Sequence, residues 1–288
     1  MPELPEVETV RRGLADLLPG KVFASAGQRD SPKSFPNAEA DVRQFLVGAT
    51  VRGVRRRAKV LLIDLDTDHS LVIHLKMTGQ LVFRGQRSFG AGHPNGSLIG
   101  ELPDRSTRVV MAFTDGSHLY FNDQRKFGWV KLMPSLEVPN IDFMRKVGPE
   151  PLEADFTAAQ FAERFKRRGK TNIKAALLDQ TVVAGVGNIY ADESLWGAKI
   201  DPRRLVGSLS DADFTRLHQE LRDVMNLAIE KGGSTDRNYV DAEGRRGSYM
   251  DFARVFRREG QKCPRCGEEI IKIRWAGRGT HLCENCQK

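Results

Sequence analysis

The first eight residues, MPELPEVE, place a proline directly after Met1, and the chemistry of a proline changes when it stands at the end of a chain. If Met1 is removed, Pro2 carries a free secondary amine, and an amine can attack a carbonyl carbon to form an imine. An α-amine has a pKa of about 8, against about 10.4 for lysine, so roughly a tenth of it is neutral at pH 7. Glu3 is adjacent and can move protons. The plainer alternative is that Pro2 only permits Met1 removal and that Pro5 opens a helix.

The four cysteines of the chain lie near its end as two Cys-x2-Cys pairs, namely Cys263, Cys266, Cys283 and Cys286. This spacing matches a four-cysteine zinc ribbon, in which two knuckles close a tetrahedron around one Zn²⁺. Four sulfurs leave no coordination position for a substrate, so this zinc is expected to be structural. His281 is a competing ligand, but four cysteines suffice. Because no other cysteine is present, a disulfide framework is not expected and a reducing cytosol fits.

The chain is basic, with a net charge of +8. Such a charge favours a polyanionic partner, nucleic acid before an acidic membrane surface. Arg274 and Arg278 lie in the hairpin expected between the cysteine pairs, and Lys170 lies within a basic run. Each basic run alone is more often a solvated face, but beside a zinc ribbon they favour DNA or RNA binding. The runs are VRRRAK (54–59), KRRGKTNIK (166–174) and RVFRREGQK (254–262).

A glycine-rich turn, AGVGNIY (184–190), leads into a predicted helix. Its backbone N–H groups could hold one phosphate, with the Asn188 side chain as a further donor. The alternative is a tight turn between two helices. The stretch lacks the glycine spacing of a dinucleotide-binding or P-loop motif, so no nucleotide cofactor is expected.

Two further stretches follow predicted strands and carry side chains that can enter a base stack. In DQRKFG (123–128), Phe127 stands close to Arg125, and an aromatic flanked by cations can wedge between bases. In HLKMTG (74–79), Met77 is the corresponding candidate. The alternative for both is ordinary: Phe127 and Met77 would be core residues with solvated neighbours.

The elements that must position these groups change character along the chain. After a short helix with Val7, Val10 and Leu14 on one face, the pattern up to residue 134 is typical of β-strands. A Gly/Pro/Ser-rich loop, FRGQRSFGAGHPNGSLIGELPD (83–104), interrupts these strands. Predicted strands cover 59–66, 71–77, 107–113 and 118–122, with a hairpin turn at TDGS (114–117). This half is expected to be a two-layer β structure with the N-terminal helix packed on it.

The second half has helical periodicity, with short helices at 156–168, 173–180 and 189–198. A longer helix is expected to open with a capping box of Ser210 and Asp213 and to stop at Gly232-Gly233. The predicted division is 1–134, a linker at 135–155, a helical domain at 156–260 and a zinc finger at 261–288. The fold class is therefore α+β and multidomain.

The N-terminal segment carries charged residues and has no apolar core typical of a secretory signal. The longest apolar runs, such as VLLI (60–63), are too short to span a bilayer. A cytoplasmic protein without a membrane partner is expected.

Together these motifs resemble one family in order and over the whole chain: the bacterial formamidopyrimidine-DNA glycosylases, with the endonuclease VIII group as close relatives. The matching stretches are PELPEVET, HLKMTG, DQRKFG, GPEPL, IKAALLDQ with GVGNIYADESL, and CPRCG with GRGTHLCENCQ. The resemblance implies a β-sandwich domain that carries the N-terminal helix, a helical domain with a helix–two-turns–helix motif, and a zinc finger. It implies a bifunctional DNA glycosylase and AP lyase of base-excision repair. Such an enzyme acts as a monomer on damaged double-stranded DNA near the bacterial nucleoid.

The resemblance also implies roles for individual residues. Pro2 is the nucleophile, Glu3 the general acid and base, and Lys59 a hairpin lysine that assists catalysis and contacts phosphate. Glu6 helps to orient the amine, although a purely structural role is the stronger interpretation. The residues implied to bind phosphate are Lys174, Asn188 and Arg278, to which we add Lys170. The resemblance implies strand cleavage by β-elimination and then δ-elimination, with Arg278 also as an acid in the δ-elimination. Met77, Arg125 and Phe127 fill the gap left by the extruded base.

Several positions depart from the family pattern. Ala58 stands where glycine often precedes the hairpin lysine, DQRKFG lacks the commoner proline and second arginine, and Ser106 replaces a frequent DNA-contacting histidine. STDRNYVDAEGRRGSYMDFARVF (234–256) resembles the segment that covers an oxidised purine, which favours 8-oxoguanine and formamidopyrimidines. Two alternatives remain: a sister enzyme for oxidised pyrimidines, and a non-catalytic DNA-binding zinc-ribbon protein.

Overall fold

The computed structural model describes residues 2–93, 95–233 and 249–288. The described residues form two compact units, and each is considered by itself. The first runs to Arg145 and includes Lys231–Gly233; the second comprises Lys146–Glu230 and Tyr249–Lys288. Within the described residues, no helix is both long and apolar enough to cross a membrane.

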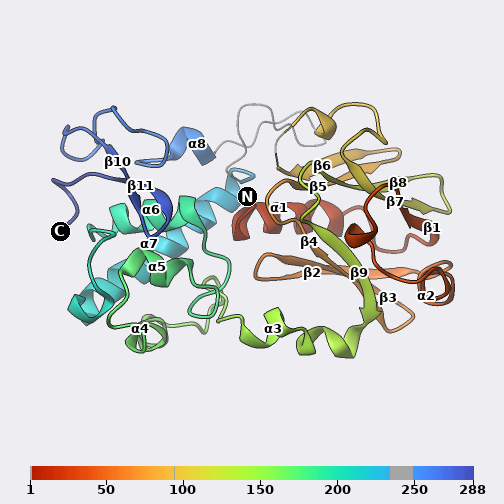
Figure 1. The fold of residues 1–288 in the computed structure, drawn as a ribbon, viewed down its shortest axis with the longest axis horizontal. Helices are drawn as coiled ribbons and strands as arrows, with labels where there is room; N and C mark the ends of the chain where they lie inside the picture. Colours follow the sequence, from red (N-terminus) through yellow and green to blue (C-terminus); the bar gives the residue numbers. More distant parts are fainter. Residues whose placement is uncertain (1, 94, 234–248) are drawn as a thin grey trace. The chain divides into compact units, whose positions relative to one another are not determined.

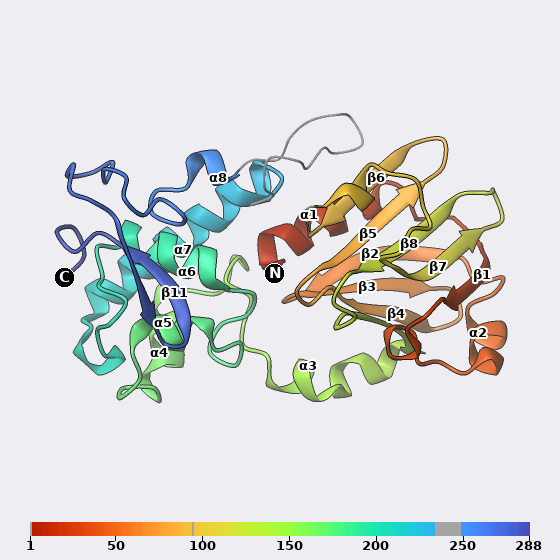
Figure 2. The same cartoon turned by 45° about the horizontal axis from the view of Figure 1, so that its top comes forward.

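The first unit is a sandwich of two antiparallel sheets (Figures 1 and 2). One sheet has the order β1-β7-β8-β5-β6 and the other β2-β3-β4-β9. The strands are β1 (Phe23–Gln28), β2 (Val51–Arg57), β3 (Val60–Leu65), β4 (His69–His74), β5 (Gly79–Arg84), β6 (Ser88–Gly92), β7 (Thr107–Phe113), β8 (His118–Asp123) and β9 (Trp129–Pro134). The helical segments are α1 (Leu4–Ala15), η1 (Pro32–Ser34), α2 (Glu39–Phe45), η2 (Gly96–Leu98), η3 (Ser135–Asn140) and α3 (Asp142–Lys146).

Helix α1 packs against β2, β3 and β6, so that it forms part of the sandwich core (Figure 2). Its apolar face, Val7, Val10 and Leu14, is fully buried in a cluster that takes side chains from both sheets. Burial of this stripe orients the helix, because most helical stability in proteins comes from packing of an amphipathic face. The predicted two-layer structure with a packed N-terminal helix is confirmed.

The segment predicted as one loop at 83–104 is more regular than expected. Ser88–Gly92 forms strand β6 at the edge of the five-stranded sheet, paired with β5. Phe89 in this strand lies directly against α1, where a Cβ on Gly13 would come within 2.2 Å of its ring. The prediction of a loop was wrong here because SFGAG shows no polar–apolar alternation, the usual strand signal.

The second unit is built around α6 and α7, which pack against each other (Figure 1). Its elements are α4 (Ala158–Lys166), α5 (Ile173–Leu178), α6 (Asn188–Gly197), η4 (Val206–Ser208), α7 (Asp211–Glu230), α8 (Tyr249–Phe252), β10 (Ile271–Trp275) and β11 (Arg278–Leu282). The capping box at α7 is confirmed: the Ser210 amide donates to Asp213 Oδ2 at 2.9 Å and the Asp213 amide to Ser210 Oγ at 3.2 Å. Phe161, Phe165, Phe214 and His218 form an aromatic core between α4 and α7.

Candidate active site and metal centre

The start of α1 fixes the first predicted catalytic residues in the sandwich. Pro2 is buried, and Glu3 and Glu6 are only 3% and 7% exposed. Glu3 is the N-cap of the helix, and its backbone N–H donates to Glu6 Oε2 at 2.7 Å. A carboxylate at this position satisfies an amide that a helix leaves unpaired. This bond is a structural role for Glu6, in line with the stronger interpretation, and a role in orienting the amine stays a prediction.

Lys59 lies in the turn between β2 and β3 and is buried except for 6% of its surface. The preceding Ala58 has a φ of 52°, a left-handed conformation in which a Cβ atom is unfavourable and glycine is normally preferred. Arg56 holds this turn: its Nη1 donates to the Ala58 carbonyl at 2.9 Å and its Nε to Glu8 Oε2 at 3.1 Å. Because Glu8 belongs to α1, the helix that begins at Glu3 also anchors the turn that carries Lys59.

The imidazole of His74, at the end of β4, is a largely buried neutral group that sequence reasoning missed, and its ring lies near those of Trp129 and Phe143. Burial, and then the positive charges of Lys76 and Lys59, lower the pKa of His74 to about 3. Its Nδ1 accepts the Lys76 backbone N–H at 3.0 Å, which leaves Nε2 as the protonated nitrogen of a neutral ring. The only signal in the sequence was its place as the first residue of HLKMTG.

Asp123 connects the two loops, HLKMTG and DQRKFG, that are predicted to enter a base stack. Its side chain is fully buried and accepts the Thr78 hydroxyl, the Arg125 N–H at 3.1 Å and the Gly128 N–H at 2.6 Å. Thr78 belongs to HLKMTG and Asp123 to DQRKFG, so a single carboxylate sets the shape of one loop and its distance from the other. Gly128 has no room for a side chain, since a Cβ would lie 2.9 Å from the His74 carbonyl oxygen.

The tips of these loops carry the predicted wedge residues. Phe127 is 54% exposed, and the Arg125 guanidinium carbon lies 4.8 Å from the centre of its ring. Met77 is partly exposed. The exposure of both side chains leaves them available for contact with a partner. The alternative in which Phe127 is a core residue is wrong.

Replacing Asp123 with alanine should lower the free energy of unfolding by about 3 kcal/mol, because the buried Thr78 hydroxyl and the buried Gly128 N–H lose their acceptor together. Urea unfolding followed by circular dichroism measures this loss. Asp30→Ala is the matched control: Asp30 pairs with Arg108 and Lys126 but is 56% exposed, so solvent screens these pairs and the loss of stability should be much smaller than for Asp123→Ala. Equal losses in the two variants would contradict a central role for Asp123.

In the second unit, two predicted phosphate-binding residues donate hydrogen bonds to the same backbone carbonyl. Lys174 Nζ and Asn188 Nδ2 both donate to the Gly279 carbonyl, at 3.2 Å and 2.9 Å. Gly279 directly follows Arg278, whose side chain is exposed beside the two-residue turn of the β10–β11 hairpin. The structure thus gathers Lys174, Asn188 and Arg278 around one strand. Lys170 lies exposed on the turn between α4 and α5.

Lys174 is not simply a surface cation. Its side chain is fully buried, its Nζ lies 2.6 Å from Asp192 Oδ1, and it donates to Thr280 Oγ1 at 2.6 Å. The other oxygen of Asp192 accepts the His281 backbone N–H at 2.9 Å. A buried charge is tolerated when it is paired and hydrogen-bonded. Asp192 therefore links α5, α6 and β11, a role that its sequence position did not reveal.

The four cysteine sulfurs lie within 4.8 Å of one another. The Cys263 and Cys286 sulfurs are 3.8 Å apart and those of Cys266 and Cys283 are 3.4 Å apart, well beyond the disulfide bond length of about 2.05 Å. Zinc–sulfur bonds of about 2.3 Å in a tetrahedron place the sulfurs about 3.8 Å apart, so the arrangement fits one zinc ion. The four cysteines form a structural zinc centre, as predicted.

Ser106, where the family often has histidine, belongs to a buried polar cluster. Its hydroxyl donates to Asp104 Oδ1 at 2.7 Å and lies 3.0 Å from the Ser97 hydroxyl. These residues line a hollow of about 460 Å³ together with Arg108 and Gln124. The segment 234–248, which contains most of the stretch expected to cover an oxidised purine, lies outside the described residues.

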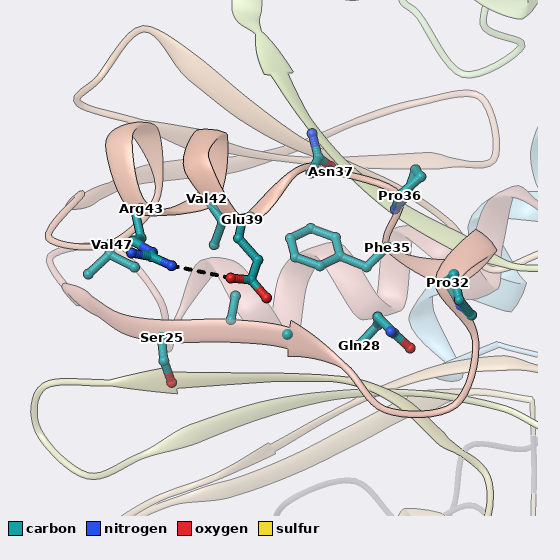
Figure 3. A pocket seen from close by; sticks show the side chains of 12 residues that line it. Ser25, Gln28, Pro32, Phe35, Pro36, Asn37, Glu39, Val42, Arg43 and Val47 are labelled. Atoms are coloured by element: carbon teal, nitrogen blue, oxygen red, sulfur yellow. Dashed lines mark hydrogen bonds and ion pairs between the residues drawn. The ribbon is translucent and has the colours of Figure 1, made fainter.

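A second hollow, of about 480 Å³, lies between β1 and α2 (Figure 3). Phe35 and Val42 contribute apolar surface, and Glu39 and Arg43 form an ion pair of 3.2 Å at its edge. No residue predicted for catalysis or DNA binding lines it. This hollow is therefore not part of the predicted site.

Comparisons with known proteins cover the whole chain. Three family models match in succession: the formamidopyrimidine-DNA glycosylase N-terminal domain over residues 1–130, the formamidopyrimidine-DNA glycosylase H2TH domain over 147–239, and the zinc finger found in FPG and IleRS over 260–288. The formamidopyrimidine-DNA glycosylase of Streptococcus mutans is 41% identical over 289 residues, which is 100% of both chains.

Solved structures agree. A Lactococcus lactis FPG mutant in complex with DNA that contains Fapy-dG has a TM-score of 0.87 and 36% identity, with 100% of both chains covered. MutM in complex with DNA that contains carbocyclic 8-oxo-G has a TM-score of 0.86 and 35% identity, again over 100% of both chains.

The structure combines a β-sandwich that begins with an N-terminal helix, a helical unit, and a four-cysteine finger joined to that unit. These features define a multidomain zinc-finger protein with clustered basic side chains. The family matches then specify which one. The chain belongs to the formamidopyrimidine-DNA glycosylase family.

Proposed function

We propose that this protein is a bifunctional DNA glycosylase and AP lyase of base-excision repair that removes oxidised purines from duplex DNA. The observation that carries the proposal is the full-length match to a relative named as a formamidopyrimidine-DNA glycosylase, together with family models that run from residue 1 to the zinc finger at residues 260–288. Similar structures in complex with DNA that contains Fapy-dG and carbocyclic 8-oxo-G favour oxidised purines as the substrate class.

In the first step the Pro2 nitrogen, freed by removal of Met1, attacks C1′ of the damaged nucleotide. The C1′–N bond of the base breaks, and the base leaves with the electron pair and takes a proton. The Pro2 nitrogen loses its own proton; the C1′–O4′ bond of the sugar then breaks, O4′ takes a proton, and the nitrogen lone pair forms the C=N bond of an iminium. Glu3, held at the N-cap of α1, is the acid and base for these transfers. Lys59, in the turn anchored to α1 through Arg56 and Glu8, stabilises the negative charge that develops on the sugar and phosphate.

The iminium then acidifies the neighbouring C2′ proton. Its removal breaks the C3′–O bond and expels the 3′ phosphate, which is the β-elimination. A second proton loss, at C4′, breaks the C5′–O bond in the δ-elimination, with Arg278 as the proposed acid. Hydrolysis of the remaining imine returns the free Pro2 amine.

Before chemistry, the damaged nucleotide must leave the base stack, which costs a few kcal/mol. We assign the filling of the gap to Met77, Arg125 and Phe127, which the Thr78–Asp123 link holds on adjoining loops. The exposed ring of Phe127 and the guanidinium stacked on it suit a wedge between bases.

Phosphate contacts are assigned to Lys170, Lys174, Asn188 and Arg278, and Lys174 and Asn188 also hold the β11 backbone at the Gly279 carbonyl. Because phosphate contacts release counterions, affinity should fall steeply with salt. We further propose that the protein acts as a cytoplasmic, nucleoid-associated monomer with domains at 1–134, 156–260 and 261–288 and a linker at 135–155.

Borohydride trapping tests the function. The protein, freed of Met1, should give a covalent adduct with a duplex containing 8-oxoguanine, and none with the undamaged duplex, because only an imine is reduced to a stable bond. A duplex with an oxidised pyrimidine is the discriminating substrate. Faster trapping and cleavage on the pyrimidine would favour the endonuclease VIII-like alternative, and binding without any adduct would favour a non-catalytic protein.

A further inference from the structure

The C-terminal end of α6 lies against the zinc centre. Trp196, in the last turn of this helix, packs in one apolar cluster with Cys263, Cys283, Val255 and Ile270, and Cys286 adjoins the same cluster. The indole is only 6% exposed. Two zinc ligands, one from each knuckle, therefore share a buried contact surface with a side chain of the helical part of this unit.

A residue of the first knuckle also packs against this indole. Arg265 lies between Cys263 and Cys266, and its guanidinium carbon is 3.9 Å from the centre of the Trp196 ring. Its two terminal nitrogens donate to the carbonyl oxygens of Trp196 at 3.0 Å and Gly197 at 3.2 Å. These carbonyls end α6, where a cation is favoured, and the Trp196 carbonyl also accepts the Lys199 backbone N–H at 3.1 Å. Arg265 thus attaches the knuckle to α6 in two ways: it binds the carbonyls at the end of the helix, and it stacks on the Trp196 ring.

One polar group of the Trp196 indole has no partner in this packing of the described side chains. Its Nε1–H is buried, and within the described residues it has no hydrogen-bond partner that meets ordinary geometry. The Cys263 thiol lies in the same cluster and has a side-chain interaction with Trp196. A thiolate bound to zinc is a good acceptor for an N–H group, and a zinc ion with four thiolates carries excess negative charge that such donors stabilise.

We propose that Trp196 is a positioning residue of the zinc centre: its indole N–H donates to the sulfur of Cys263 in the zinc-loaded protein and slows release of the metal. Arg265 keeps the indole in place. The zinc ion would then stabilise α6 as well as the finger, and α6 in turn would retain the zinc. This inference is independent of the glycosylase activity, because neither Trp196 nor Arg265 has a role in the reaction proposed above.

Trp196→Phe tests this, because phenylalanine keeps an aromatic ring but has no N–H. In the full-length zinc protein, transfer of zinc to the chromophoric chelator 4-(2-pyridylazo)resorcinol should be about tenfold faster than in the unchanged protein. In the cobalt-substituted protein, the sulfur-to-cobalt charge-transfer band should shift to lower energy, since a thiolate without the donor is richer in electrons. Trp275→Phe is the matched control: Trp275 lies at the hairpin turn, away from Cys283, and its replacement should leave both readouts unchanged.

Arg265→Lys is the second variant, because it leaves the indole intact but removes the planar group stacked on it. Zinc release should again accelerate, by a smaller factor than in Trp196→Phe. Circular dichroism of each variant shows whether the fold is retained, and if Trp196→Phe does not fold, Arg265→Lys decides the outcome. Wild-type release rates in the folded variants, or equal effects of Trp196→Phe and Trp275→Phe, would overturn the proposal.

Discussion

A form of the protein in which a leader peptide acylates the Pro2 nitrogen should excise 8-oxoguanine at least about 10³-fold more slowly than the same chain after the leader is removed. An amide nitrogen has no available electron pair, so it cannot attack C1′, whereas every side chain of the site is unchanged. Single-turnover cleavage of a labelled duplex, before and after proteolytic removal of the leader, measures the effect.

The comparison needs a test that the leader does not merely disturb α1. Pro2 is buried, and the Glu3 amide is held by Glu6, so the thermal midpoint of both forms should be compared first. Glu3→Gln with a free Pro2 amine is a second control, which should retain the nucleophile and lose proton transfer. If the acylated form, correctly folded, cleaves at the rate of the free form, Pro2 is not the nucleophile.

Replacing Lys174 with methionine should lower the free energy of unfolding by about 3–5 kcal/mol, because the Asp192 carboxylate is then buried without a cation. Both side chains are fully buried, so solvent screens the pair little. The variant should also bind DNA more weakly, since the Gly279 carbonyl and the strand beside Arg278 lose one of their two anchors. Urea unfolding and fluorescence anisotropy with a duplex containing an abasic-site analogue measure the two effects.

The double variant Lys174→Met with Asp192→Asn separates stability from DNA binding. Removing the uncompensated charge should recover much of the lost stability, while an amide oxygen can still accept the His281 N–H. If Lys174 contributes to DNA binding through its charge or its hold on β11, the double variant should remain weak in the anisotropy measurement. A double variant no more stable than Lys174→Met would contradict the buried-pair explanation.

Much of the fold could be predicted from local patterns. The stripe of Val7, Val10 and Leu14, the capping box at Ser210 and the cysteine spacing each depend on residues close in sequence, and each is present as expected. Strand β6 was missed because a glycine-rich edge strand has weak intrinsic preference, and its contact with Gly13 is distant in sequence.

The candidate site was predictable as a set of motifs but not as an arrangement. Nothing local indicates that Asp123 must accept the Thr78 hydroxyl, or that Asp192 must pair with Lys174 and His281. Both carboxylates have the sequence appearance of ordinary polar residues, and their importance follows only from burial and from partners brought close by folding. The left-handed backbone of Ala58 is likewise a property of the turn and not of the residue type.

The shared attachment of Lys174 and Asn188 to the Gly279 carbonyl limits how far the C-terminal finger can be treated as an interchangeable module. Strand β11 pairs with β10 in a fixed register, with Gly279 opposite Arg274. Inserting or deleting one residue in the turn would bring a different residue under the two donors and reverse the faces on which Arg278 and Gly279 lie. A finger transplanted from another protein would bind zinc, yet it would support this helical domain only if its hairpin had the same length.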